Sequence, residues 1–181
     1  SGSVFIDPCS DEVVLAGQGT IALEIFAQHP EIDTILVPIG GGGILTGISV
    51  AAKHINPNVK VIGLQTAACP AMVQSLKDKV FYEMFPTESS ICDALVGGVG
   101  EIPYNMADKC IDDIWVIEEE DIASAVSFLA KKEKVISEPA GAIGVAAVRN
   151  NISLLKGKNV AVVITGGNID ENLMVSLLNQ Y

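Results

Sequence analysis

Short apolar runs rich in β-branched residues alternate along this chain with longer stretches whose apolar residues recur at helical spacing. The short runs predict strands at 34–37, 59–64, 113–116 and 159–164. The longer stretches predict helices at 21–28, 44–55, 71–77, 105–109, 118–132, 139–148 and 171–178. Alternating strands and helices are typical of a parallel sheet wrapped by helices. We therefore expect an α/β fold, an open and mostly parallel twisted sheet with helices on both faces.

Two regions follow this pattern less regularly. Near the start, Val4–Ile6 predicts a further strand, and Asp11 opens a short helical turn that Gly17–Gly19 ends. Residues 66–100 are the least regular part of the chain. Because no repeat, low-complexity tract or linker interrupts the sequence, we expect residues 1–181 to form a single domain.

Composition narrows the possible partners. The chain is 49% hydrophobic and 18% charged, which is enough apolar material for a sizeable core. Its formal net charge of −11 argues against nucleic acid or an anionic membrane as partner, since both are polyanions. No apolar stretch reaches the roughly 20 residues of a membrane span. A phosphate would have to be bound locally, by backbone N–H groups rather than by a basic surface.

The cysteines stand far apart, at positions 9, 69, 92 and 110, and no two of them form a Cys-x-x-Cys pair. The two histidines are not at metal-ligand spacing with them, so we expect no metal site. Reduced and mostly buried thiols in a cytoplasmic protein are the simplest interpretation. No signal peptide is recognisable.

The strongest local signal is the loop Gly40-Gly41-Gly42-Gly43, set between a predicted strand and a predicted helix. Consecutive glycines let the backbone approach a ligand closely, and the N–H groups at a helix N-terminus converge on an anion. A βα turn that merely packs closely would give the same letters. A Walker A loop would need Gly-Lys-Ser/Thr, and a dinucleotide site an acidic residue where Gln65 stands, so both are disfavoured.

Two further segments carry candidate chemistry. Thr165-Gly166-Gly167-Asn168 follows the last predicted strand, and ligands of open parallel sheets lie at the carboxyl ends of strands. A threonine hydroxyl there can hydrogen-bond a ring nitrogen. The segment SEPAGA at 137–142 opens a helix with small residues, and Glu138 stands at its entry. Alone, each segment also fits an ordinary turn or an acidic helix cap with proline.

Taken together and in this order, the motifs resemble the threonine/serine dehydratase and serine racemase branch of fold-type II pyridoxal-phosphate enzymes. The matching segments are AGQGTIALEI at 16–25, VPIGGGGILTGI at 37–48, VIGLQ at 61–65, DDI at 112–114, SEPAGA at 137–142 and ITGGNID at 164–170. The likeness covers nearly the whole chain. It implies the large domain of that fold, which is similar to the tryptophan synthase beta chain, and pyridoxal 5'-phosphate as cofactor.

The resemblance also implies roles for single residues. Gly40–Gly43 with Ile44 would hold the cofactor phosphate, and Thr165 would hydrogen-bond the pyridine nitrogen. The ring and substrate side of the pocket would be lined by Asp93, Ala94, Leu95 and Glu138. A neutral hydroxyl leaves the ring nitrogen largely unprotonated, which suits β-elimination from L-threonine or L-serine to a 2-oxoacid and ammonia. A homodimer or higher homo-oligomer is expected on the same ground.

Three departures from the family pattern matter. Where the family often has Ala-Asp-Gly, this chain has Cys92-Asp93-Ala94, so the pocket there is expected to be narrower. The carboxylates that bind a divalent cation in serine racemases are replaced by Gln65 and Ala71, so we expect no such site. The Schiff-base lysine and the substrate-carboxylate loop have no counterpart, because the first lysine is Lys53 in the helix after the glycine loop.

The missing lysine sets the functional expectation. We expect the chain to be the C-terminal part of a longer enzyme, most of its cofactor-binding large domain without the small domain, and inactive by itself. Serine racemase chemistry stays open, because the residue acting on the second face of the substrate would lie in the absent part. A non-catalytic phosphate- or nucleotide-binding module is the alternative of a different class. Sulfhydrylases usually have a Gly-Thr-Gly-Gly-Thr loop, which the four glycines contradict.

Overall fold

The computed structural model describes residues 2–181 and contains a four-stranded sheet of order β3-β2-β1-β4. The strands are β1 (Thr34–Pro38), β2 (Lys60–Thr66), β3 (Asp113–Ile117) and β4 (Val160–Val162). All three pairings are parallel, with Thr34 opposite both Lys60 of β2 and Val160 of β4. Parallel neighbours need crossover connections, which helices supply here. The expected α/β fold is confirmed.

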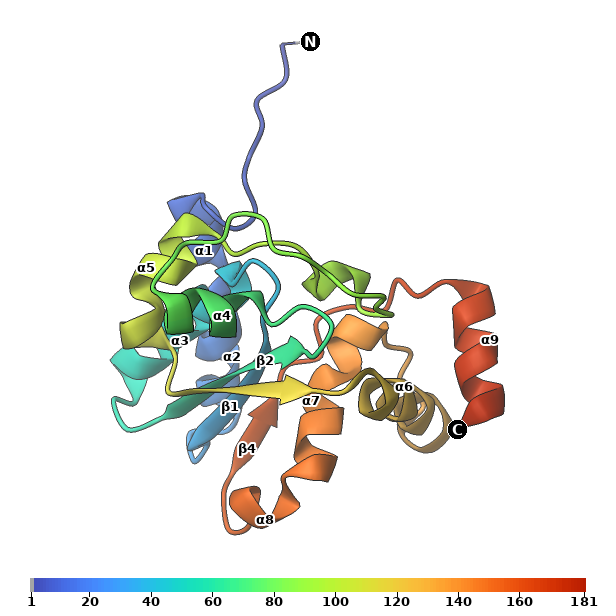
Figure 1. Cartoon of the computed structure of the whole chain (residues 1–181). Helices are drawn as coiled ribbons and strands as arrows, with labels where there is room; N and C mark the ends of the chain where they lie inside the picture. The colour runs from blue at the N-terminus through green and yellow to red at the C-terminus, as the bar shows by residue number, and fades with distance from the viewer. Residues whose placement is uncertain (1) are drawn as a thin grey trace.

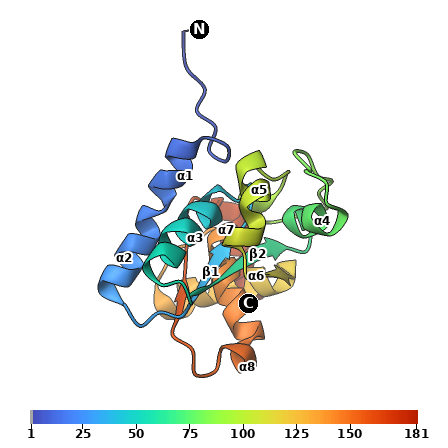
Figure 2. The ribbon, with the colours of Figure 1, turned by 90° about the vertical axis from the view of Figure 1, so that its left-hand side faces the viewer.

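Helices cover both faces of the sheet (Figure 1). One face carries α1 (Glu12–Gln18), α2 (Thr20–Gln28), α3 (Gly43–Ile55), α4 (Ala71–Asp78) and α5 (Glu101–Cys110). The other carries α6 (Glu119–Phe128), the π-helical turn η2 (Leu129–Glu133), α7 (Pro139–Asn150) and α9 (Glu171–Gln180). The view in Figure 2 shows α1 and α2 outside α3. The sheet is thus the middle layer.

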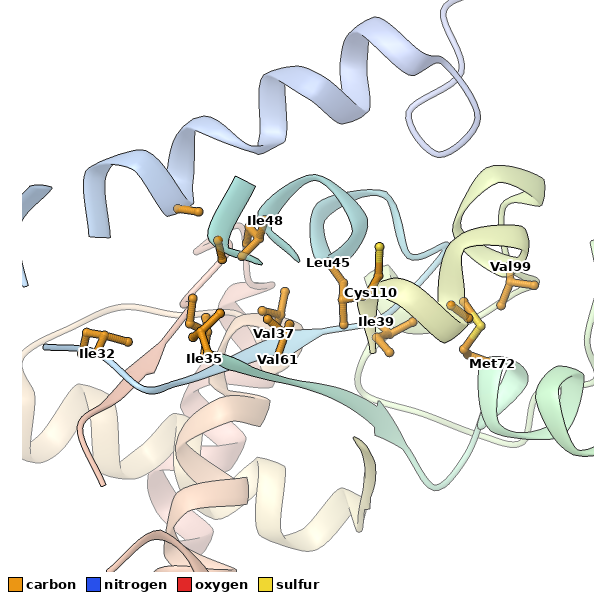
Figure 3. Close-up of a cluster of buried hydrophobic side chains, with 14 of the residues drawn as sticks. Ile32, Ile35, Val37, Ile39, Leu45, Ile48, Val61, Met72, Val99 and Cys110 are labelled. Carbon is orange, nitrogen blue, oxygen red and sulfur yellow. The ribbon is translucent and has the colours of Figure 1, made fainter. Parts of the chain in front are cut away.

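The central strand β1 is buried on both sides. Ile35 and Val37 are 0% exposed and lie toward Leu45 and Ile48 of α3 (Figure 3). Leu36, between them in sequence, belongs to the second core on the α7 side. Each such side chain stabilises the fold by roughly 1.5–3 kcal/mol when fully buried. The end of β1, from which the glycine loop starts, is therefore held firmly in place.

The predicted strand at Val4–Ile6 is wrong. This segment runs extended away from the body, with Val4 86% and Phe5 83% exposed, and no described strand pairs with it (Figure 1). Its β-branched and aromatic side chains favour a strand only where a partner is present.

Other boundaries differ modestly. The predicted strand 159–164 shortens to Val160–Val162, since the chain pairs with β1 only there. The short helices α8 (Ile152–Leu155) and η1 (Asp93–Leu95) were not predicted. In the part of the chain described, none of the helices is long and apolar enough to cross a membrane.

Candidate functional site: a glycine-loop pocket at the carboxyl edge of the sheet

The glycine loop connects β1 to α3, and its neighbours leave no room for a side chain, as two positions illustrate. Gly42 has φ +92°, and a Cβ there would come 2.7 Å from Cβ of Pro103 in α5. A Cβ on Gly40 would come 2.7 Å from the Ala94 carbonyl oxygen. The loop is therefore packed between α5 and the segment around Ala94. Close packing of the loop and close approach to a ligand are both served by the same glycines.

The loop presents backbone donors at the N-terminus of α3. Within residues 2–181, no acceptor is recorded for the N–H groups of Gly40, Gly41, Gly42 and Ile44. A hydrogen bond from Gly100 N–H to the Gly41 carbonyl, 2.8 Å long, holds the loop in place. Free N–H groups and the positive end of the dipole of α3, a helix of 13 residues, favour an anion at this place.

A pocket of about 300 Å³ opens in front of these donors. It brings together segments that are far apart in the sequence: the glycine loop with Ile44, the wall formed by Ala94 and Leu95, Glu138 at the start of α7, and Thr165 after β4. Asp93 does not line this pocket. It lines an adjoining hollow of about 340 Å³, which Glu138 also borders. Every predicted site residue thus lies in one of two neighbouring hollows.

Glu138 and Thr165 are placed by one pair of turns. Glu138 N–H donates to the Gly166 carbonyl at 3.0 Å, and Ser137 Oγ donates to the same oxygen at 3.2 Å. A Cβ on Gly166 would come 2.5 Å from Glu138 Oε1, so the turn after β4 lies directly against the carboxylate. The segments at 137–142 and 164–170 therefore form one structural unit. Glu138 is half-buried, whereas Thr165 is exposed.

Among the lining residues to which the sequence assigned no role, two carry a polar atom in the side chain, Cys9 and Gln18. Cys9 lies in a tight turn, because the Asp7 carboxylate accepts from Cys9 N–H at 2.7 Å and from Ser10 N–H at 2.9 Å. Burial, and after it the Asp7 charge, raises the pKa of Cys9, so the thiol is protonated at neutral pH. Gln18 lies in the segment 16–25 that resembles the enzyme family, so the sequence could have indicated its place in the pocket. Cys9 lies in no such segment.

The wall residues follow a buried thiol. Cys92 and Cys69 are 0% exposed and Cys110 is 2% exposed, so the expectation of mostly buried cysteines is confirmed. Burial and the Glu119 carboxylate raise the pKa of Cys92 far above the usual range for a thiol. A group so hard to ionise cannot serve as a nucleophile in the pocket.

Gln65 has a structural task in this chain. Its Oε1 accepts from Met72 N–H at 3.0 Å and from Val73 N–H at 3.1 Å, so it caps the first turn of α4. Among residues 2–181, no group of three or more His, Cys, Asp or Glu side chains is arranged to hold a metal ion. That no divalent cation binds here stays a prediction, which calorimetry with magnesium would test.

Comparison with known proteins shows which family the chain is similar to. A family profile described as "Pyridoxal-phosphate dependent enzyme" matches residues 1–166. The chain is 44% identical to an L-threonine ammonia-lyase of Thermotoga maritima, over 99% of this chain and 45% of that protein. It is 39% identical to a serine racemase of Arabidopsis thaliana, over 94% of this chain and 53% of that protein.

Solved structures show the same likeness. A processed threonine deaminase isoform from Solanum lycopersicum superimposes with a TM-score of 0.90 at 28% identity, over 98% of this chain and 52% of that one. A serine racemase from Dictyostelium discoideum gives 0.83 at 31% identity, over 91% and 53%. The chain thus spans about half the length of the curated relatives it matches.

Proposed function

Because the chain belongs to the family of pyridoxal-phosphate dependent enzymes, we propose that it is the cofactor-binding portion of a threonine/serine dehydratase, an ammonia-lyase acting by β-elimination. The observation that carries this proposal is the pocket where the glycine loop, Glu138 and Thr165 meet. Relatives about twice as long supply the remainder of the enzyme in their own chains.

The residues present fit a phosphorylated pyridine cofactor. The N–H groups of Gly40, Gly41, Gly42 and Ile44 would offer donors to a phosphate, and no basic side chain lines the pocket among the described residues. Thr165 offers a neutral hydroxyl to a ring nitrogen. When bound, pyridoxal phosphate supplies an electron sink for the carbanion left at the substrate Cα.

We expect the groups of this chain to bind the cofactor and orient the substrate rather than to react with either. The loop donors would fix the phosphate, and Leu95, only 6% exposed, would keep water from one side of the ring. The Glu138 carboxylate, placed by the turn at Gly166, would lie on the substrate side with Asp93 in the next hollow. No lysine lines the pocket among the described residues. Lys53 is engaged elsewhere, by the Asp112 carboxylate.

Binding of pyridoxine 5'-phosphate to the chain tests the proposal. This probe has the ring and the phosphate but no aldehyde, so it cannot react with surface lysines. We expect stoichiometric binding by calorimetry, and an affinity about fivefold to tenfold weaker in Thr165→Val, which removes one hydroxyl at nearly constant volume. Inorganic phosphate should bind both forms equally. Absence of any binding of the probe at millimolar concentration would refute the proposal.

A serine racemase is the second candidate. It is favoured by the likeness to a serine racemase over 94% of this chain. In the part of the chain described, the residues that hold the cofactor would be the same for both reactions. Product analysis of the full-length parent enzyme with L-serine decides between them: D-serine for a racemase, ammonia and a 2-oxoacid for a dehydratase.

A further inference from the structure

The wall of the pocket at Asp93–Leu95 belongs to the least regular part of the chain. The segment from Lys79 to Ile91 contains no helix or strand and is largely exposed. The wall nevertheless lies hard against the glycine loop, since a Cβ on Gly40 would come 2.7 Å from the Ala94 carbonyl oxygen. Something outside the pocket must therefore hold an irregular segment at a fixed distance from the loop.

One carboxylate, Glu119 in the first turn of α6, receives three donors from two segments. Its Oε2 accepts from Ile91 N–H at 2.7 Å, and its Oε1 accepts from Ser90 Oγ at 2.9 Å. Thr66 Oγ1, at the end of β2 and 0% exposed, donates to the same Oε1. Hydrogen bonds to a charged acceptor are about twice as strong as neutral ones. The carboxylate thus links an irregular segment to the rigid edge of the sheet.

The link continues into the wall. Cys92 N–H donates to Ser90 Oγ at 2.9 Å, and Leu95 N–H donates to the Cys92 carbonyl at 2.9 Å. Cys92 and Leu95 are buried at 0% and 6% exposure, so the segment has little freedom once Ser90 is fixed. Glu119 itself lines neither hollow of the site.

We propose that Glu119 is a positioning residue of the site, which fixes the Asp93–Leu95 wall against the glycine loop by anchoring Ser90 and Ile91 to the end of β2. The proposal rests on the proposed function, because the wall matters for binding only if a ring lies against it. A phosphate alone would contact the loop donors and not the wall. The two kinds of ligand therefore report on different parts of the site.

The variant Glu119→Ala, tested on the whole chain, separates these parts. It should lower the affinity for pyridoxine 5'-phosphate about tenfold, because three donors lose their shared charged acceptor. The affinity for inorganic phosphate should change by less than about twofold. Glu119→Gln should restore most of the affinity. Its amide oxygen can accept from Ile91 N–H, and its amide NH2 group can donate to the hydroxyls of Ser90 and Thr66 once these rotate. The matched control is Glu120→Ala in the same helical turn, where the exposed carboxylate has no hydrogen bond among the described residues.

The proposal would be overturned if Glu119→Ala lowered the affinity for both ligands equally. It would also be overturned if Glu120→Ala lowered the affinity for pyridoxine 5'-phosphate as much as Glu119→Ala does. Amide hydrogen exchange tests the anchor without any ligand: Ile91 and Leu95 should exchange faster in Glu119→Ala only. If the wild-type chain binds neither ligand, the proposed function fails, and the exchange rates still decide whether Glu119 holds the wall. Unchanged exchange at both amides would refute the anchor even where the probe binds.

Discussion

At the scale of single residues, the glycine loop depends on its backbone more than on any side chain. Gly42 holds φ +92°, a region that side chains rarely adopt, and its Cα faces Pro103. We expect Gly42→Ala to lower the free energy of unfolding by about 1–3 kcal/mol and to abolish phosphate binding. Urea unfolding followed by the single Trp115 measures the first effect.

The chain offers a matched control for that substitution. Gly17 lies inside α1, has nothing within 4 Å of a built Cβ and no positive φ. Gly17→Ala should raise stability by about 0.5–1 kcal/mol, since alanine favours a helix more than glycine does. A loop that tolerated alanine at Gly42 as well as α1 does at Gly17 would contradict the structure.

Cys9 reports on occupation of the pocket. It lines the glycine-loop pocket and is the one cysteine of the four that is not buried. We expect iodoacetamide to label Cys9 first, and pyridoxine 5'-phosphate to slow that labelling. Because burial and Asp7 raise the pKa of Cys9, the rate should keep rising above the usual thiol range, near pH 8.5. Labelling that is unaffected by the probe would place the ligand elsewhere.

Sequence reasoning reached the site residues that belong to contiguous motifs, and failed for those that only the fold brings in. The glycine loop and Thr165 carry their own signals, because backbone freedom and position after a strand can be read from letters. Cys9 reaches the pocket because a turn stabilised by Asp7 places it there. The sequence around Cys9 contains no motif that predicts this position. Gln18 stood in a recognised segment, but its direction depends on how α1 packs on α3.

At the scale of elements, Asp112 joins α3, β2 and the start of β3. Its carboxylate accepts from Lys53, from Lys60 at 3.1 Å and from Val61 N–H at 2.8 Å. Burial alone would raise the pKa of Asp112, but the bonds from Lys53, Val61 and Lys60 outweigh it and hold the pKa below the usual value. The stabilisation is therefore present above the unfolded pKa of about 3.9 and lost as pH falls through the lower folded value.

Asp112→Asn should lower the free energy of unfolding at pH 7 by about 1 kcal/mol, since the ion pairs are partly solvated. The difference from wild type should shrink toward pH 3. Urea titrations at both pH values check this, with the exposed Asp108→Asn as control, which should be neutral. A difference that stays constant between pH 7 and pH 3 would show that charge is not its origin.

Element prediction succeeded where burial was strong and failed where pairing was the deciding factor. The mostly apolar β1 and the helix after it were predicted within a residue of their ends. Val4–Ile6 has the letters of a strand without a partner, and 159–164 is a strand only where β1 lies beside it. Pairing is a non-local property, so composition over six residues cannot determine it.

At the scale of the whole molecule, a pocket that no lysine lines among the described residues leads us to expect cofactor binding without turnover. We expect the pure 181-residue chain, with added pyridoxal phosphate, to release no ammonia or oxoacid from L-threonine. The L-threonine ammonia-lyase of Thermotoga maritima assayed alongside is the positive control. Steady oxoacid production by the chain would show that another group replaces the absent lysine. The expected homo-oligomer stays a prediction for sedimentation analysis.

The strand order has a consequence for how the protein is made. Asn159 N–H bonds Asp33, 126 residues earlier, and β4 pairs with the central β1 across the same distance. On the ribosome, β1, β2 and β3 can assemble before β4 has been synthesised, and Thr165 emerges only after β4. The pocket is therefore completed only after β4 has emerged, and a chain stalled before β4 would leave one edge of β1 unpaired and be a substrate for chaperones.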